Sequence, residues 1–146
     1  MAVPGFLAPI NDVTTDLDQP PVFFVTPPHT HSYDHARLGS LHRKFYGDLA
    51  NVAIPWPPEE SLSRIERLVK RRGWTVSGVD RPGLRIQAVA ITRLMRFRDD
   101  VVIAVRPATP TSSIVAMRSK SRVGRGDLGT NARRIRVFLE ALASGG

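Results

Sequence analysis

Residues 84–106, LRIQAVAITRLMRFRDDVVIAVR, decide the fold. In the first part, aliphatic side chains occupy every second position, which places Leu84, Ile86, Ala88 and Ala90 on one face of an extended chain. The opposite face then carries Arg85, Gln87, Val89 and Ile91. The spacing predicts a strand over Leu84–Thr92, extended or bent at Leu94–Phe97, and a second strand over Val101–Arg106. The acidic pair Asp99-Asp100 predicts a turn between them.

Two further strands flank this pair. Trp74–Val79 precedes it across the turn DRPG at 80–83, and Ser113–Ser119 follows it across a proline-containing loop at 107–112. Neighbouring strands joined by short connections pair antiparallel, so these four strands are expected to form an antiparallel meander.

One helix is predicted before the meander along the chain and another after it. The first opens on PPEE at 57–60, carries apolar residues at helical spacing and stops before Gly73. The second covers about Leu128–Ala143, with Asp127 as its N-cap. Each helix has one apolar face, so both are expected on the same side of the sheet. The fold class is therefore α+β.

Residues 1–57 contain eight of the twelve prolines, which disfavours long helices and central strands. Apolar anchors such as Val22–Val25 and Trp56 still occur there. We interpret this segment as an extended arm that wraps over a core domain at 58–146, with a short helix near Ser32–Leu41. Arm and core form one structural unit.

Charge is divided unevenly between these parts. The chain carries a formal charge of +8, with three Lys/Arg and five Asp/Glu in residues 1–57 (−2), and eighteen and eight in residues 58–146 (+10). A basic domain suggests an anionic partner: nucleic acid, anionic lipid or a small polyanion. The alternative is a basic surface that only confers solubility. Trp74, Phe97 and Phe138 fall on predicted core positions rather than on an exposed stacking surface, which favours an anionic small molecule or a protein partner over nucleic acid.

The composition excludes several classes of site. Without cysteine there can be no disulfide, thiolate catalysis or cysteine-ligated metal. The longest apolar run, Val101–Val105, is far shorter than a membrane span, and Met1–Gly5 does not resemble the start of a signal peptide. We expect a soluble, cytoplasmic protein, with a location peripheral to a membrane as the alternative.

The junction between the last strand and the last helix is the first candidate site. Residues 118–136 hold seven Lys/Arg and one Asp, interrupted by glycines just before a helix. Such a junction can bind an anion through backbone amides and arginines; the candidate residues are Ser119, Ser121, Arg122, Arg125, Asn131 and Arg134. The alternative is structural: Gly124 and Gly129 shape a turn, Asp127 caps the helix, and an arginine such as Arg122 or Arg96 pairs with Asp127.

A second candidate is a pocket between sheet and arm lined by Asp12, Thr15, Asp16 and Asp99. The alternative is that Asn11–Asp16 forms a turn that locks the arm. Asp99 and Asp100 do not form a converging acid–base pair, because adjacent residues of an extended chain point in opposite directions.

Three histidines at 29, 31 and 35 lie near Asp34, but a metal pair there would need a third ligand. We interpret them as a surface cluster and expect no metal and no cofactor.

Three blocks of sequence resemble a known family. They are NDVTTD at 11–16 followed by PPVF at 20–23, then residues 92–107 containing FRDDVVI, and RSKSRVGRGDLG at 118–129 followed by Asn131 and Arg134. Together they are similar to the bacterial and plastid family catalogued as domain of unknown function 1499. The resemblance implies no established activity. Many members look exported or membrane-anchored, and this chain shows neither an anchor nor a signal.

Three functions follow as hypotheses. The first is a non-catalytic binding or accessory module that recognises an anionic group at the basic junction. The second is a structural subunit of a larger assembly, which could be membrane-associated, with the arm as its docking element. The third is an enzyme with a pocket between the sheet and the arm; the lack of an evident catalytic relay favours a protein without catalysis.

Overall fold

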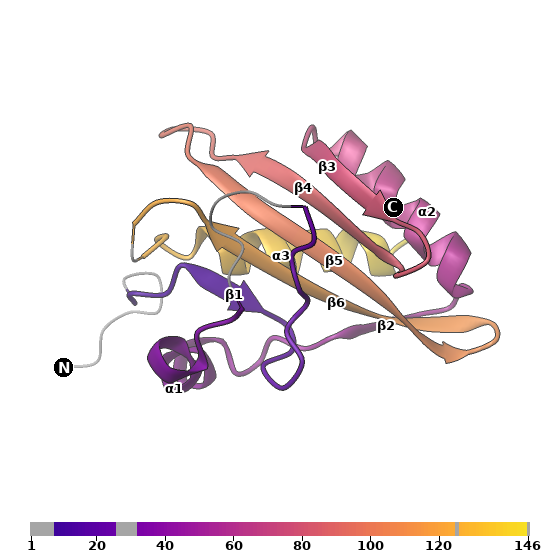
Figure 1. Cartoon of the computed structure of the whole chain (residues 1–146), viewed down its shortest axis with the longest axis horizontal. Coiled ribbons are helices and arrows are strands. Elements are labelled where there is room, and N and C mark those ends of the chain that lie inside the picture. Colours follow the sequence, from indigo (N-terminus) through magenta and orange to yellow (C-terminus); the bar gives the residue numbers. More distant parts are fainter. Residues whose placement is uncertain (1–7, 26–31, 125, 146) are drawn as a thin grey trace.

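A computed structural model describes residues 8–25, 32–124 and 126–145 and contains one antiparallel sheet covered by helices (Figure 1). The elements follow in the order β1 (Asp12–Thr14), α1 (His35–Tyr46), β2 (Val52–Ile54), α2 (Pro58–Arg71), β3 (Thr75–Asp80), β4 (Arg85–Ile91), β5 (Arg98–Thr109), β6 (Ser112–Ser121) and α3 (Thr130–Ala143). The predicted α+β class is confirmed.

The sheet has six strands rather than the four of the predicted meander. Strands β3 to β6 pair in the predicted order, and the arm adds two three-residue strands to β6. Strand β1 pairs with residues 118–120, and β2 pairs with residues 113–115. These strands satisfy backbone groups of β6 that would otherwise form an open sheet edge. The prolines therefore did not keep the arm out of the sheet, although both added strands lie at its edge.

The central hairpin is longer than predicted, and two of its predicted connections are wrong. Asp99 and Asp100 lie within β5, paired with Ser121 and Lys120. Residues 107–109, predicted as loop, also belong to β5. The cross-strand pairing of β5 with β6 extends over these residues and overrides their local preference for turns.

Both helices of the core pack on the same face of the sheet, as predicted, and Figure 1 shows them behind the strands. Helix α2 begins at Pro58 with Glu59 and Glu60 in its first turn, where acidic side chains interact favourably with the positive end of the helix dipole. Helix α3 begins at Thr130, two residues later than predicted. Trp74 stacks on Phe138 at a ring-centroid distance of 5.2 Å, which joins the start of β3 to α3.

The opposite face of the sheet is crossed by the arm, which runs in front of the strands in Figure 1. The side chain of Gln87 pairs with the arm's backbone: its Oε1 accepts hydrogen bonds from the amides of Phe24 and Val25 at 2.9 and 3.0 Å. Below them a Cβ at Gly78 would lie 2.7 Å from a methyl of Val25, so only glycine permits this close approach. The arm thus packs on the domain.

Helix α1 is tied to the sheet edge through a buried histidine. The Nε2 atom of His42 accepts a hydrogen bond from the backbone amide of Thr14 in β1 at 3.1 Å. Tyr33 and Tyr46 make edge-on contacts with its ring. Burial lowers the pKa of His42 below its usual value of 6.5, and Asp12 and the Thr14 contact oppose that effect. The neutral ring is therefore part of the folded state.

This burial predicts acid sensitivity. Because the unfolded chain protonates His42 at a higher pH than the folded protein does, stability should fall as pH drops below about 6.5. Urea unfolding at pH 7.5, 6.5 and 5.5 should show a loss of stability that is smaller in His42→Gln, whose side chain does not titrate. Equal pH slopes for the two proteins would contradict this expectation, whatever their stability at pH 7.5.

Within the described ranges, the structure contains no helix with the length and apolarity needed to cross a membrane.

Candidate functional site

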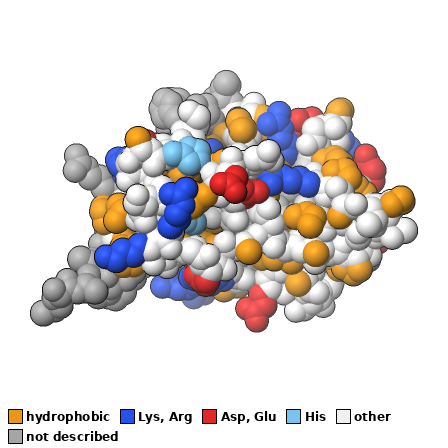
Figure 2. Space-filling view, turned by 90° about the horizontal axis from the view of Figure 1, so that it is seen from below, with side chains coloured by type: hydrophobic (Ala, Val, Ile, Leu, Met, Phe, Trp, Pro, Cys, Tyr) orange, Lys and Arg blue, Asp and Glu red, His pale blue; other side chains and the backbone are white. Residues whose placement is uncertain are grey.

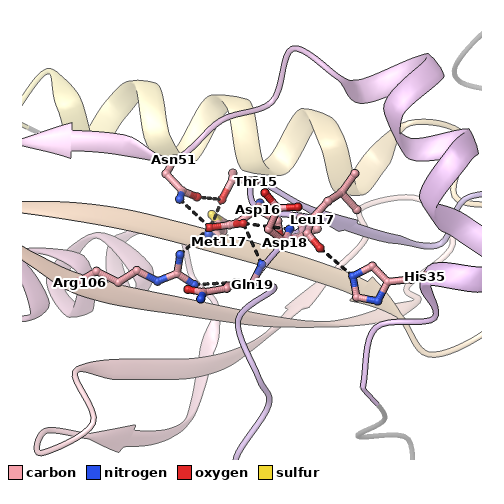
Figure 3. Close-up of polar contacts among 10 residues, drawn as sticks. Thr15, Asp16, Leu17, Asp18, Gln19, His35, Asn51, Arg106 and Met117 are labelled. Carbon is pink, nitrogen blue, oxygen red and sulfur yellow. Dashed lines mark hydrogen bonds and ion pairs between the residues drawn. The ribbon is translucent and has the colours of Figure 1, made fainter.

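Polar residues at the start of the arm form a first cluster of hydrogen bonds that fastens the arm to the sheet, which we call a lock (Figure 3). Asp16 accepts hydrogen bonds from Asn51 at 3.0 Å and from Arg106 of β5. Thr15 donates to Asn51 at 2.7 Å and accepts from the amide of Met117 at 2.9 Å. Burial would raise the pKa of Asp16, but these hydrogen bonds and the charge of Arg106 outweigh burial and lower the pKa. Asp16 is thus held as a carboxylate.

Asp12 forms a second lock with Arg118 of β6. The guanidinium donates through Nε and Nη2 to the two carboxylate oxygens at 2.9 and 2.8 Å, and through Nη1 to the carbonyl of Pro21 at 3.0 Å. The rings of Phe23 and Tyr33 lie over the same guanidinium. Both charged side chains are almost wholly buried.

The four residues proposed for a pocket between sheet and arm therefore do not gather in one place. Asp12, Thr15 and Asp16 hold the arm by contacts within the protein. Asp99 lies on the other face of the sheet, where it faces Arg134 of α3, because it alternates along β5 with Asp100. The pocket role of these residues stays a prediction, and their observed contacts agree with the alternative of a locking turn.

At the basic junction, four of the predicted anion-binding residues do converge. Asn131, fully buried at the start of α3, accepts hydrogen bonds from Ser119 at 2.6 Å and from Arg134 at 2.9 Å. Its amide nitrogen donates to Ser121 at 2.8 Å and to Asp127 at 2.7 Å. This network joins strand β6 to helix α3, so the polar groups of these residues form hydrogen bonds with one another.

The glycines and Asp127 shape the turn before α3. Gly124 and Gly129 have φ angles of 82° and 78°, in the left-handed region that favours glycine. Gly129 occupies the N-cap position predicted for Asp127. The Asp127 carboxylate nevertheless accepts hydrogen bonds from the amides of Gly129 and Asn131 at 2.8 and 3.0 Å. Asp127 therefore caps the helix from two residues further back.

Of the two remaining candidates, the structure describes only Arg122. Arg122 makes two hydrogen bonds, of 3.0 and 2.9 Å, to Asp100 on the sheet face that the arm crosses. Its suggested pairing with Asp127 is wrong. Arg125 lies outside the described residues, so its anion-binding role stays a prediction.

Asp99 is the buried carboxylate of the junction. Its side chain is 1 % exposed and faces Arg134, whose Nη1 lies 2.8 Å from Oδ2. The contact has the distance of an ion pair without the direction of a good hydrogen bond. Burial raises the pKa of Asp99 above the usual value, and Arg134 opposes that rise. A carboxylate so placed is easier to protonate than an ordinary one.

Above Asp99 and Ser121 lies an open pocket of about 850 Å³, which we call the junction pocket. One wall comes from the connection between β4 and β5, through residues 92–95 and 97. The other comes from described residues before and at the start of α3, at 123, 124, 126–128 and 130. Both connections leave the same end of the sheet (Figure 1). Apolar and arginine side chains line it: Ile91, Leu94, Met95, Phe97, Val123, Leu128, Arg93, Arg133 and Arg134.

The pocket's apolar wall was missed by sequence reasoning. Phe97 was assigned to the core, yet it is 44 % exposed and lines the junction pocket. Leu128, which lines the pocket, and Arg96, in the connection that forms the other wall, have positive φ angles of 55° and 58°. Such backbone strain in non-glycine residues is concentrated at functional sites. The alternation of arginine with large apolar residues in RLMRFR, 93–98, was the signal that could have revealed it.

The histidine cluster falls mostly on residues that the structure does not describe, since His29 and His31 lie outside the described ranges. His35 contacts the carbonyl of Leu17 at 2.7 Å through Nε2, as Figure 3 shows. Among the described residues, no group of three His, Asp or Glu side chains is arranged to hold a metal ion.

The basic charge is not one continuous field. On the face seen in Figure 2, Lys and Arg side chains form separate groups, with acidic and uncharged side chains between them. Arg118, Arg122 and Arg134 each pair with an aspartate of the sheet. A ligand attracted by charge would therefore meet local sites at the arginines that remain.

Comparison with known families gives a match over most of the chain. Residues 12–142 match the family model described as Protein of unknown function (DUF1499). No curated protein matches the sequence.

Proposed function

Because this chain belongs to the DUF1499 family, whose description names no activity, we propose from the geometry of the junction pocket that it is a non-catalytic binding module. Its ligand carries an anionic group and an apolar part, and it binds in the junction pocket.

The arginines at the rim carry this proposal. Arg93 and Arg133 line the junction pocket, and neither side chain contacts a carboxylate within the described residues. The charges deeper in the pocket are already balanced, since Arg134 faces Asp99 and Asp127 binds the helix amides. An anionic group therefore finds its favourable partners at the rim, where arginine can donate two parallel hydrogen bonds.

The apolar wall selects the rest of the ligand. Leu94, Phe97 and Leu128 would cover an aliphatic or aromatic body, and the volume falls in the range of small-molecule sites, roughly 300–1,000 Å³. An adjoining groove shares Arg93 and Arg133 with the junction pocket and adds Arg72, which increases the positive charge on the same side. The ligand class is an anionic amphiphile.

The other hypotheses have less support. As an enzyme, the protein would have to use Asp99, whose raised pKa suits a proton acceptor, but whose ion pair with Arg134 would have to open. As an assembly subunit docking through its arm, it would have to use a segment already bound to β6 and Gln87. These contacts favour the pocket over the arm as the place where a partner binds.

Dodecanoate and dodecanol provide a direct test, because they share a chain and differ in charge. In titration calorimetry, dodecanoate should bind with one site and dodecanol at least tenfold more weakly. Arg133→Gln should weaken dodecanoate about 10–100-fold, the value of a charge-assisted hydrogen bond. Arg136→Gln is the matched control, because Arg136 lies on the same helix and pairs with Asp48.

Equal binding of dodecanoate to Arg133→Gln and to Arg136→Gln would refute the proposal. Equal affinity for dodecanoate and dodecanol would also refute it, because the pocket would then recognise only the hydrocarbon chain that the two compounds share.

A further inference from the structure

The connection between β4 and β5 presents large apolar side chains to solvent. We call residues 92–98 the arginine loop, with the sequence TRLMRFR. Leu94 is 89 % exposed and Met95 is 62 % exposed, and neighbouring Phe97 is also exposed. Soluble proteins scatter exposed apolar residues singly, whereas three within four positions at the tip of a loop indicate an interaction surface.

The arginines of the loop are placed around these apolar side chains. Arg93, Arg96 and Arg98 are all exposed. Unlike Arg118, Arg122 and Arg134, none of them contacts a carboxylate within the described residues. The loop therefore offers a cluster of unneutralised positive charge and apolar surface together, with no acidic side chain among its seven residues.

The loop is held closed by its own hydrogen bonds. Thr92 donates its amide to the carbonyl of Phe97 at 2.8 Å and accepts the amide of Arg96 at 3.1 Å. Its hydroxyl accepts the amide of Phe97 at 2.8 Å. Because the backbone is already ordered, presenting Leu94 and Met95 to a partner costs little further conformational entropy.

We propose that the arginine loop docks this protein onto the surface of a bilayer that contains anionic lipids. Leu94 and Met95 enter the boundary between headgroups and acyl chains, and the three arginines contact lipid phosphates. Apolar side chains flanked by basic ones are the pattern by which interfacial segments bind membranes. Each basic residue near an anionic leaflet adds attraction, which is why charge complementarity favours this partner over a neutral surface.

The second wall of the junction pocket widens the docking surface. Leu128 and Val123, at the facing connection, are exposed apolar residues as well. Docking in this orientation would turn the mouth of the pocket toward the bilayer. The inference goes beyond the proposed function and does not depend on it, because a loop can bind a membrane whether or not the pocket holds a ligand.

Vesicle sedimentation tests the inference with the whole chain. Vesicles of phosphatidylcholine with equal phosphatidylglycerol should carry the protein down at low salt, and vesicles of phosphatidylcholine alone should not. Leu94→Ser combined with Met95→Ser should reduce binding about tenfold or more, because the apolar contact with the bilayer is lost. Val22→Ser is the control, since Val22 is an exposed apolar residue on the arm.

Insertion is tested separately by Leu94→Trp. Its added fluorescence should shift to the blue on anionic vesicles and should be quenched by lipids brominated in the upper acyl chain, relative to a background from Trp56 and Trp74. Equal binding to both vesicle types would overturn the inference, as would wild-type binding by the double serine variant or an unquenched tryptophan at position 94. Arg133→Gln should still bind vesicles even if it loses dodecanoate, so failure of one proposal is distinguishable from failure of the other.

Discussion

Replacing Asp12 by alanine is expected to destabilise the protein by about 3–5 kcal/mol, the cost of leaving a buried charge without its partner. Arg118 is 1 % exposed and makes two short charged contacts with Asp12. The carbonyl of Pro21 and the rings of Phe23 and Tyr33 remain, but none of them neutralises the guanidinium. The loss should appear in urea unfolding at pH 7 as a lower midpoint with a similar slope.

Two further variants make this expectation sharp. Asp48→Ala removes a carboxylate whose pairing with Arg136 is exposed, so it should cost about 0–1 kcal/mol. Combining Asp12→Ala with Arg118→Met should recover part of the lost stability, because no charge is then left buried. Two results would show that the buried pair is not what holds the arm. One is an Asp12→Ala variant as stable as Asp48→Ala, and the other is a double variant less stable than Asp12→Ala alone.

Replacing Asn131 by alanine is the second large effect, expected at about 2–4 kcal/mol. The amide of Asn131 uses both donor hydrogens and both acceptor positions in a place without solvent access. Alanine would leave Ser119, Ser121 and Arg134 each short of a partner. The connection between β6 and α3 would loosen, and with it the floor of the junction pocket.

Asn51→Ala is the matched control for that change. Among the described residues, Asn51 accepts a side-chain hydrogen bond from Thr15 and donates one to Asp16, in a partly exposed place. Its loss should therefore cost about 1 kcal/mol. Urea unfolding of both variants measures the difference, and amide hydrogen exchange should show faster opening in α3 of Asn131→Ala. Equal stability of the two variants would mean that the network at the junction contributes no more than an ordinary polar contact.

Local pattern was sufficient for the frame of the fold. Alternation assigned Ile86 and Gln87 to opposite faces of a strand, and the structure agrees because a strand's side chains must alternate. Helical spacing assigned Leu62 and Ile65 to a buried stripe, and both are fully buried. These inferences succeed because they depend on neighbours a few residues away.

The same reasoning failed where a residue's state depends on a distant strand. Asp99 and Asp100 look like a turn on their own, but β6 pairs with both and places them in β5. Phe97 looks like a core residue, but it is exposed on the loop that joins β4 to β5. Local propensity could not foresee these outcomes, since it carries no information on what packs against a segment.

The sequence by itself determined the class of the fold, the order of the central strands, the single face that carries both core helices and the basic character of the junction. Only the tertiary structure decided which charges meet: Arg118 with Asp12, 106 residues away, Arg122 with Asp100, and Arg134 with Asp99. The physical reason is that an ion pair forms wherever folding brings charges within a few ångströms in a desolvated place, regardless of their separation along the chain. The arginines at the rim of the junction pocket and on the arginine loop take no part in those ion pairs. They are the residues through which we propose that this protein contacts its ligand and the membrane.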